Sequence, residues 1–171
     1  VISYNTVLNA CAFSADFGSE KKKRAFQIAL QTFNILRKET INSNNKSIDN
    51  INDGKKPLVM DTISYGMFLK CCTNLLPKDK KRNDMVRNLW KLCVEEGMVG
   101  NLVMNELERA VSSHKVYKEL LGMDLFVDLN GKNTNRVNFE KMPRSWYRNV
   151  KGDNNLPGAT SAPWKRKKRD M

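Results

Sequence analysis

A stretch of ten residues occurs twice in this chain, and this internal repeat is the strongest indication of its architecture. Residues Ile2–Cys11 align with Ile63–Cys72 without a gap, and the two copies share an isoleucine, a serine, a tyrosine, a leucine and a cysteine at a constant offset of 61. Similarity at a fixed spacing indicates repeated supersecondary units, each of which buries its apolar face against a neighbour. We therefore expect a chain built from copies of one unit.

The bulky residues of each copy have the spacing of a helix face. Positions i, i+3, i+4 and i+7 are apolar in both copies, as they are along one side of an amphipathic helix. These residues are Tyr4, Val7, Leu8 and Cys11 in the first copy and Tyr65, Phe68, Leu69 and Cys72 in the second. A second helical pattern follows each copy, around Phe33 and around Trp90, so the expected unit is a helical hairpin and the expected fold class is all-α.

The remaining organisation follows from one insertion and two more helical patterns. An offset of 61 exceeds the roughly 33 to 45 residues of common helical repeats, and the Asn-rich segment 40–57 lacks helical periodicity, which predicts an inserted loop. Apolar patterns through Val103 and Leu107, and then through Leu121, predict two further helices. The resulting division is repeat 1 at 1–60, repeat 2 at 61–98, a degenerate third repeat or capping helices at 99–129, and a tail at 130–171.

The positive charge of the chain is concentrated in its tail. The 171 residues include 30 Lys or Arg and 18 Asp or Glu, a net charge of +12, and residues 130–171 hold 11 of these cations against three acidic residues, or +8. The tail is rich in Asn and poor in aliphatic residues, which predicts disorder. As an alternative, its apolar residues fold back and cap the end of the last repeat. These residues are Phe139, Met142, Trp146 and Tyr147.

Several functional classes lack support in the sequence. No apolar run approaches the roughly 18 residues that a membrane span needs. Four cysteines without regular spacing do not indicate a disulfide scaffold, and with the single histidine, His114, they form no metal-ligand pattern. Nucleotide-binding and hydrolase motifs are absent as well. We therefore expect reduced thiols packed in the core, and no metal, cofactor, small-molecule substrate, membrane contact or catalysis.

Three segments resemble pentatricopeptide (PPR) repeats. Residues Val1–Ala12 (VISYNTVLNACA) are similar to the start of such a repeat, Val59–Tyr65 (VMDTISY) to the junction between two repeats, and Ala29–Leu36 (ALQTFNIL) to the second helix. The resemblance covers residues 1 to about 121. It implies an α-solenoid that binds single-stranded RNA at about one base per repeat, in RNA processing or stability in a mitochondrion or plastid. Since the chain opens without an initiator Met and the repeats degenerate toward the tail, we expect a C-terminal fragment of a longer array.

The same resemblance implies which residues face the RNA. In the family, the residue after the first-helix tyrosine and the residue before the next repeat read one base together. Here these residues are Asn5 and Asp61, a pair that favours uracil in the family. An amide offers a base edge both a donor and an acceptor, and a carboxylate can fix its orientation. The corresponding position of repeat 2 is Gly66, followed by Val99 at the junction, and that of repeat 3 is Met104, so at most one repeat carries a readable pair.

Simpler roles are open for the same residues. Asp61 directly precedes a helix and is also a candidate N-cap, while its amide partner on the first helix can be a solvated polar residue. The two repeat tyrosines and Trp90 are expected in the core rather than on bases. At the level of function, the alternative is a helical-repeat scaffold for a protein partner, in which Gly66 and Met104 mark a surface that does not read bases.

Two parts of the tail are candidates for contact with nucleic acid. The first combines guanidinium groups with aromatic rings, a combination suited to phosphate neutralisation and base stacking. Its residues are Arg144, Trp146, Tyr147 and Arg148. The second is a run of five cations at Lys165, Arg166, Lys167, Lys168 and Arg169. Such a run attracts a nucleic-acid backbone, acts as a nuclear address or stays solvated, and composition does not separate these roles.

Overall fold

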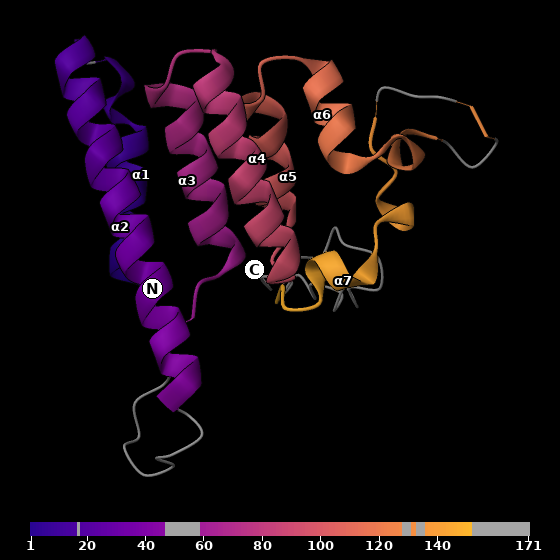
Figure 1. Cartoon of the computed structure of the whole chain (residues 1–171), viewed down its shortest axis with the longest axis horizontal. Coiled ribbons are helices and arrows are strands. Elements are labelled where there is room, and N and C mark those ends of the chain that lie inside the picture. The colour runs from indigo at the N-terminus through magenta and orange to yellow at the C-terminus, as the bar shows by residue number, and fades with distance from the viewer. Residues whose placement is uncertain (17, 47–58, 128–130, 133–135, 152–171) are drawn as a thin grey trace, which may run out of the picture.

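The computed structural model describes residues 1–16, 18–46, 59–127, 131–132 and 136–151, and within these ranges it contains seven α-helices and no strand. The all-α fold class predicted from the sequence is therefore confirmed. Figure 1 shows the longer helices following one another across the molecule in chain order, from α1 and α2 at one end to α6 near the other. Among the described helices, none has the length and hydropathy that crossing a bilayer requires.

The first hairpin consists of α1 (Ile2–Ala12) and α2 (Ser19–Lys46), joined by the short 3₁₀ turn η1 (Ser14–Asp16). The prediction of a loop from residue 40 is wrong for residues 40–46, because α2 continues through them. Thr40 is buried one turn after Leu36; its hydroxyl donates to the Leu36 carbonyl at 2.9 Å and accepts from the Met60 amide at 3.1 Å. The rest of the expected insertion, 47–57, lies outside the described residues.

Two more hairpins follow, in the places that the apolar patterns predict. The second consists of α3 (Thr62–Leu75) and α4 (Lys80–Glu95), and the third of α5 (Asn101–Ala110) and α6 (His114–Leu121). Three of these four helices begin with a side-chain cap, in which an oxygen accepts from a backbone amide of the first turn. The caps are Asp61 for α3, Asp79 for α4 and Ser113 for α6.

The leading helices of the three hairpins lie side by side, with α3 in contact with both α1 and α5. The second helices complete the core: α2 contacts α1 and α3, and α4 contacts α3 and α5. At the centre, the ring of Phe33 on α2 stacks on Phe68 of α3 at 4.4 Å between centroids and meets the edge of Tyr65 at 5.7 Å. Trp90 is buried in this core, as are all four cysteines, which are free thiols.

Equivalent positions of the three leading helices are buried at the predicted spacings. Leu8, Leu69 and Leu107 are each at most 1% exposed, and the spacing between them is 61 and then 38 residues. Cys11, Cys72 and Ala110 form a second buried row at the same spacings. The two copies of the sequence repeat therefore bury matched positions, and the third leading helix buries residues at the corresponding spacing.

A buried arginine joins the ends of two leading helices. Arg82, on α4, is 1% exposed, and its guanidinium donates to four backbone carbonyls at distances of 2.6–3.3 Å. The acceptors are Thr73 and Leu76 at the end of α3, and Arg109 and Ala110 at the end of α5. These carbonyls belong to helix ends, where a backbone carbonyl finds no amide donor within its own helix.

The first part of the tail packs where the second hairpin leads into the third, so the prediction of disorder is wrong for residues 136–151. This segment contains η3 (Phe139–Lys141) and α7 (Arg144–Tyr147), and α7 contacts α4. The ring of Trp146 meets Trp90 edge-on at 5.2 Å, and the Trp146 carbonyl accepts from the Val99 amide at 2.8 Å. The fold-back alternative is right that this segment packs on the helices, but α7 lies on α4 of the second hairpin rather than on the last repeat.

Gly97 is the point at which the tail meets the repeat. It follows α4 with φ at +66°, and its carbonyl accepts from the Asn149 amide at 3.0 Å. A Cβ at this position would lie 2.6 Å from the Arg148 side chain and 3.0 Å from the Ser145 carbonyl, so a glycine fits both the backbone conformation and the close contact. The short turn η2 (Met123–Phe126) completes the third-repeat region. Residues 152–171, including the cation run at 165–169, lie outside the described residues.

Candidate nucleic-acid interface

Asn5 and Asp61, the two residues expected to read one base, are in contact between α1 and α3. The Asn5 side-chain nitrogen donates to Oδ1 of Asp61 at 3.3 Å. Ser64, in the first turn of α3, joins them: its hydroxyl lies 2.8 Å from the Asn5 amide oxygen and 2.9 Å from the same Asp61 oxygen. Its single hydrogen bonds one of these two oxygens at a time.

Asp61 is the N-cap of α3, one of the two roles that the sequence left open for it, and it also contacts Asn5, the residue expected to read a base with it. Its Oδ1 accepts from the Ser64 backbone amide at 2.8 Å, which makes it the N-cap of α3, and it accepts from the Asn5 amide as well. The carboxylate therefore fixes the orientation of that amide. One hydrogen of the Asn5 nitrogen and one lone pair of its oxygen remain, and together they are a donor–acceptor pair that matches the edge of a base.

Sequence reasoning missed three neighbours of this pair. Ser64 is fully buried and connects both members of the pair. Ile2 and Ile63 occupy equivalent positions at the starts of α1 and α3, and they are 85% and 44% exposed. Exposed isoleucines at two matched positions offer apolar contact to a ligand held there. For the two isoleucines the signal was present in the sequence, because they occupy matched positions in the two copies of the repeat.

The two repeat tyrosines belong to the hairpin cores, as expected, although Tyr4 is only half-buried. The Tyr4 hydroxyl donates to Oε2 of Glu39 at 2.8 Å, and this hydrogen bond raises the pKa of Tyr4. Tyr65 is fully buried, and within the described chain its hydroxyl makes no hydrogen bond of ordinary geometry. Burial, and then the nearby Glu96, raise its pKa well above the ordinary value of 10. Each tyrosine thus faces a glutamate late in its own hairpin.

The junction between repeats 2 and 3 is apolar where the first junction is polar. Moving Asn5, Asp61 and Ser64 forward by one repeat gives Gly66, Val99 and Leu102. A Cβ on Gly66 would lie 2.5 Å from Cγ of Leu102, so the glycine allows α3 and α5 to approach closely. The structure therefore gives Gly66, expected to face a base, a buried packing position.

Met104 is also not part of an accessible surface. It is 2% exposed, and Val99 is fully buried. The expectation that Gly66 and Met104 mark a binding surface is therefore wrong, because both residues are buried and α3 packs against α5. Only the first junction combines polar groups with exposure.

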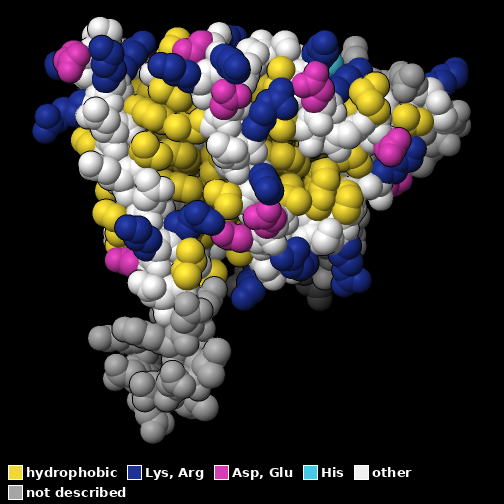
Figure 2. Space-filling model, viewed as in Figure 1, with side chains coloured by type: hydrophobic (Ala, Val, Ile, Leu, Met, Phe, Trp, Pro, Cys, Tyr) yellow, Lys and Arg dark blue, Asp and Glu magenta, His cyan; other side chains and the backbone are white. Residues whose placement is uncertain are grey.

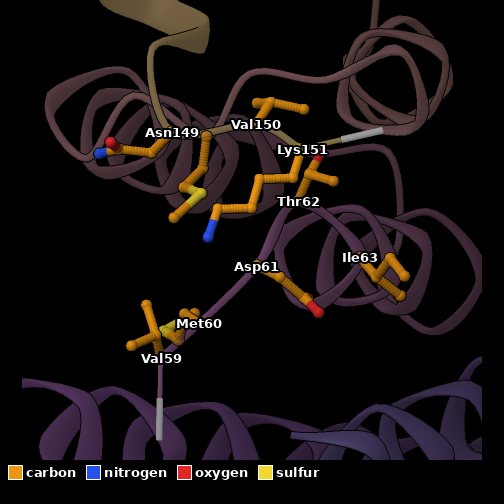
Figure 3. A pocket seen from close by; sticks show the side chains of 9 residues that line it. Val59, Met60, Asp61, Thr62, Ile63, Asn149, Val150 and Lys151 are labelled. Atoms are coloured by element: carbon orange, nitrogen blue, oxygen red, sulfur yellow. The ribbon is translucent and has the colours of Figure 1, made fainter. Parts of the chain in front are cut away.

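A cavity of about 340 Å³ lies beside Asp61. Figure 3 shows its walls, which come from three parts of the chain: the segment 59–63 that leads into α3, Met98 in the turn after α4, and the tail residues 149–151. In this view the Lys151 side chain extends across the cavity, and the carboxylate of Asp61 points away from it. The hydroxyl of Thr62, another lining residue, is buried and has no hydrogen-bond partner in the described chain.

Two of the tail residues proposed to contact RNA hold the tail on the repeat. Trp146 packs on Trp90, and the Arg148 guanidinium donates to the backbone carbonyls of Ser145 and Glu95. Arg144 is exposed and Tyr147 is half-buried. Two of the four aromatic and cationic residues of this segment are therefore engaged in contacts within the chain.

Comparisons with known proteins give no relative from which a function could be transferred. Neither protein-family models, nor curated proteins, nor solved structures include a match to this chain. In the described ranges, no group of three or more His, Cys, Asp or Glu side chains is placed to hold a metal ion.

Proposed function

We propose that this chain is part of a PPR-type α-solenoid that binds single-stranded RNA with base selectivity, and that it has no catalytic activity of its own. The hairpins would stack as successive repeats, with α1, α3 and α5 forming one layer and α2, α4 and α6 the other. The equal burial of matched positions at offsets of 61 and 38 supports this proposal.

The observation that carries the proposal is the Asn5 amide held by Asp61 at 3.3 Å. Uracil presents an N–H donor between two carbonyl acceptors, so an amide with one free donor and one free acceptor can pair with its edge. An adenine edge also offers one donor and one acceptor to an amide, so the expected preference for uracil over adenine is taken from the PPR resemblance, in which an Asn–Asp pair favours uracil. The exposed Ile2 and Ile63 would contact the faces of the base. Because the next junction is closed by Gly66 and Leu102, we expect one base to be read in this part of the array.

The affinity and the selectivity should come from different groups. With a net charge of +12, the chain attracts any polyanion, and this contribution falls as salt rises. Base preference should instead depend on the amide and should persist at higher salt, since hydrogen bonds to base edges carry the sequence information.

Substitution of Asn5 tests this division. We expect the unmodified chain to bind a uracil-rich single strand about tenfold more tightly than an adenine-rich one, and Asn5→Ala to remove most of this preference, since a two-bond contact to a base edge contributes about 1–3 kcal/mol. Fluorescence anisotropy at two salt concentrations measures both affinities. Asn9→Ala is the matched control, one turn further along α1, and should keep the preference.

Two results would contradict the proposal. One is equal affinity for both strands with a steep salt dependence, which would leave only non-specific phosphate attraction. The other is an Asn5→Ala variant that folds normally and keeps the full uracil preference.

A second function, a scaffold for a protein partner, has one observation in its favour. On the face shown in Figure 2, hydrophobic side chains form a band between charged ones, and α2 exposes Ile28, Ile35 and Ile41 by 41–48%. Apolar patches of this kind mark interaction sites on many proteins. A chain that binds neither strand but elutes with a protein partner would favour this alternative.

A further inference from the structure

The cavity beside Asp61 is lined by a cation for which the Asn5–Asp61 pair suggests no role. Of its nine lining residues, one is a cation, Lys151, and it comes from the tail, far from the repeats in sequence. In the part of the chain that the structure describes, the Lys151 ammonium forms no ion pair, and the Asp61 carboxylate in the same wall is engaged with Asn5 and Ser64. The cation therefore has no internal charge to neutralise.

The position of Lys151 is fixed by the residues immediately before it. The Asn149 amide donates to the Gly97 carbonyl at 3.0 Å, and the Asn149 side chain donates to the Glu96 carbonyl at 2.8 Å. The Val150 side chain is half-buried against the core and forms part of the cavity wall. The tail is thus fastened at the end of α4, directly opposite the start of α3, and the lysine that follows is held over the cavity.

We infer that Lys151 binds the phosphate of the nucleotide whose base is read by Asn5 and Asp61. This inference rests on the proposed RNA-binding function and adds a residue to it. A nucleotide has a planar base at one end and an anionic phosphate at the other. The site has the same polarity, because the amide–carboxylate pair lies on one side of the Asp61 backbone and the ammonium lies on the other (Figure 3).

The cavity is suited to the phosphate end of such a ligand, because Asn5 is not among its lining residues and the Asp61 carboxylate points away from it. Its volume of about 340 Å³ is at the lower end of the range of small-ligand pockets. Val59, Met98 and Val150 supply apolar walls, and Lys151 is the cation among the lining residues. The repeat and the tail each contribute part of one site, so RNA binding should depend on the folded-back tail.

The test measures the salt dependence of binding in Lys151→Met, Lys151→Arg and the control Lys141→Met, which removes an exposed cation from the same segment outside the cavity. The probe is a fluorescein-labelled oligouridylate of ten nucleotides, bound to the full 171-residue chain. One phosphate contact with a single strand contributes about 0.7 to the slope of log K against log salt. We expect Lys151→Met to lower that slope by about 0.7 and the affinity roughly fivefold at 0.1 M salt.

The variants also separate this inference from the function on which it rests. Lys151→Arg should retain the slope, and Lys151→Met should keep the preference for uracil over adenine, because a phosphate contact carries no base information. If Lys151→Met behaves like Lys141→Met while Asn5→Ala still loses the uracil preference, the inference is wrong and the proposed function stands. If the unmodified chain shows no uracil preference, both are wrong. Equal urea unfolding curves for the three lysine variants exclude a loss of folding as the cause.

Discussion

Arg82 shows how one side chain can fasten two helices whose sequences give no sign of a link. Its four acceptors are backbone carbonyls at the ends of α3 and α5. A buried guanidinium is stable in this place because four of its five N–H groups donate to backbone oxygens. The same arrangement makes its removal costly, since the carbonyls around it would lose their partner without gaining water.

We predict that Arg82→Met lowers the free energy of unfolding by about 3 kcal/mol, because methionine keeps the apolar stem but leaves buried carbonyls unsatisfied. Urea unfolding followed by circular dichroism measures this change. Arg87→Met is the matched control on the same helix: Arg87 forms an exposed ion pair with Glu119 at 3.0 Å, and pairs of this kind contribute at most about 1 kcal/mol. Equal losses in the two variants would contradict the role given to Arg82.

The residues of the first junction were predictable to different degrees. Asn5 and Asp61 could be paired in advance because the resemblance to PPR repeats implies that the residues at these two positions act together. Ser64 could not be assigned a role, since the same serine, Ser3, is exposed in the first copy, where the described chain places no helix before α1. Arg82 could not be assigned either, because a side chain that binds backbone carbonyls has no sequence pattern in its partners.

At the scale of elements, the side chain at one matched position sets how closely neighbouring leading helices approach each other. Asn5 on α1 reaches Ser64 on α3 with a polar side chain. At the next junction, Gly66 on α3 has no side chain, and Leu102 on α5 fills the space. A glycine inside a helix costs about 1 kcal/mol relative to alanine, so the packing of Leu102 must offset that cost.

Gly66→Ala should therefore destabilise the protein although alanine is the better helix former. The new Cβ would lie 2.5 Å from Cγ and 2.8 Å from Cδ2 of Leu102. Overpacking of this kind costs about 1–3 kcal/mol, and after the gain in helix propensity we expect a net loss of about 1 kcal/mol. Thermal or urea unfolding of Gly66→Ala measures it.

The double variant Gly66→Ala/Leu102→Ala supplies the control for this contact. Removing Cγ of Leu102 removes the collision, so the two losses should not add, and the double variant should be more stable than their sum by about 1 kcal/mol. Strict additivity would mean that the two helices do not depend on this contact for their spacing.

The ends of elements were harder to predict than their existence. Apolar periodicity placed α3, α4, α5 and α6 within a few residues. For α2 the Asn-rich composition after residue 39 predicted a loop, but Thr40 continues the buried face of Phe33 and Leu36. One buried side chain with two hydrogen bonds outweighs a run of weak helix formers, because tertiary contacts override propensity.

At the scale of the whole molecule, the succession of helices was predictable and the cap was not. A repeat leaves its signature in the sequence, because matched positions in each copy must fill the same kind of space. The cap over the end of α4 consists of backbone bonds at Gly97 and Val99 and of two apolar anchors, Trp146 and Val150. The composition of a segment with so few apolar anchors predicts disorder. Its packing becomes apparent only from the helix surface that it covers.

Trp146→Ala joins the stability of this cap to the proposed function. Loss of the contact with Trp90 at 5.2 Å should lower the free energy of unfolding by about 2 kcal/mol, less than for a fully buried tryptophan because Trp146 is half-exposed. Since Lys151 is held by the same segment, RNA affinity should fall together with the salt slope. The control is Lys141→Met, an exposed residue of the same segment, which should change neither the unfolding curve nor the slope. If Trp146→Ala weakens the fold but binds RNA with the original slope, the cap stabilises the last junction without contributing to the nucleotide site.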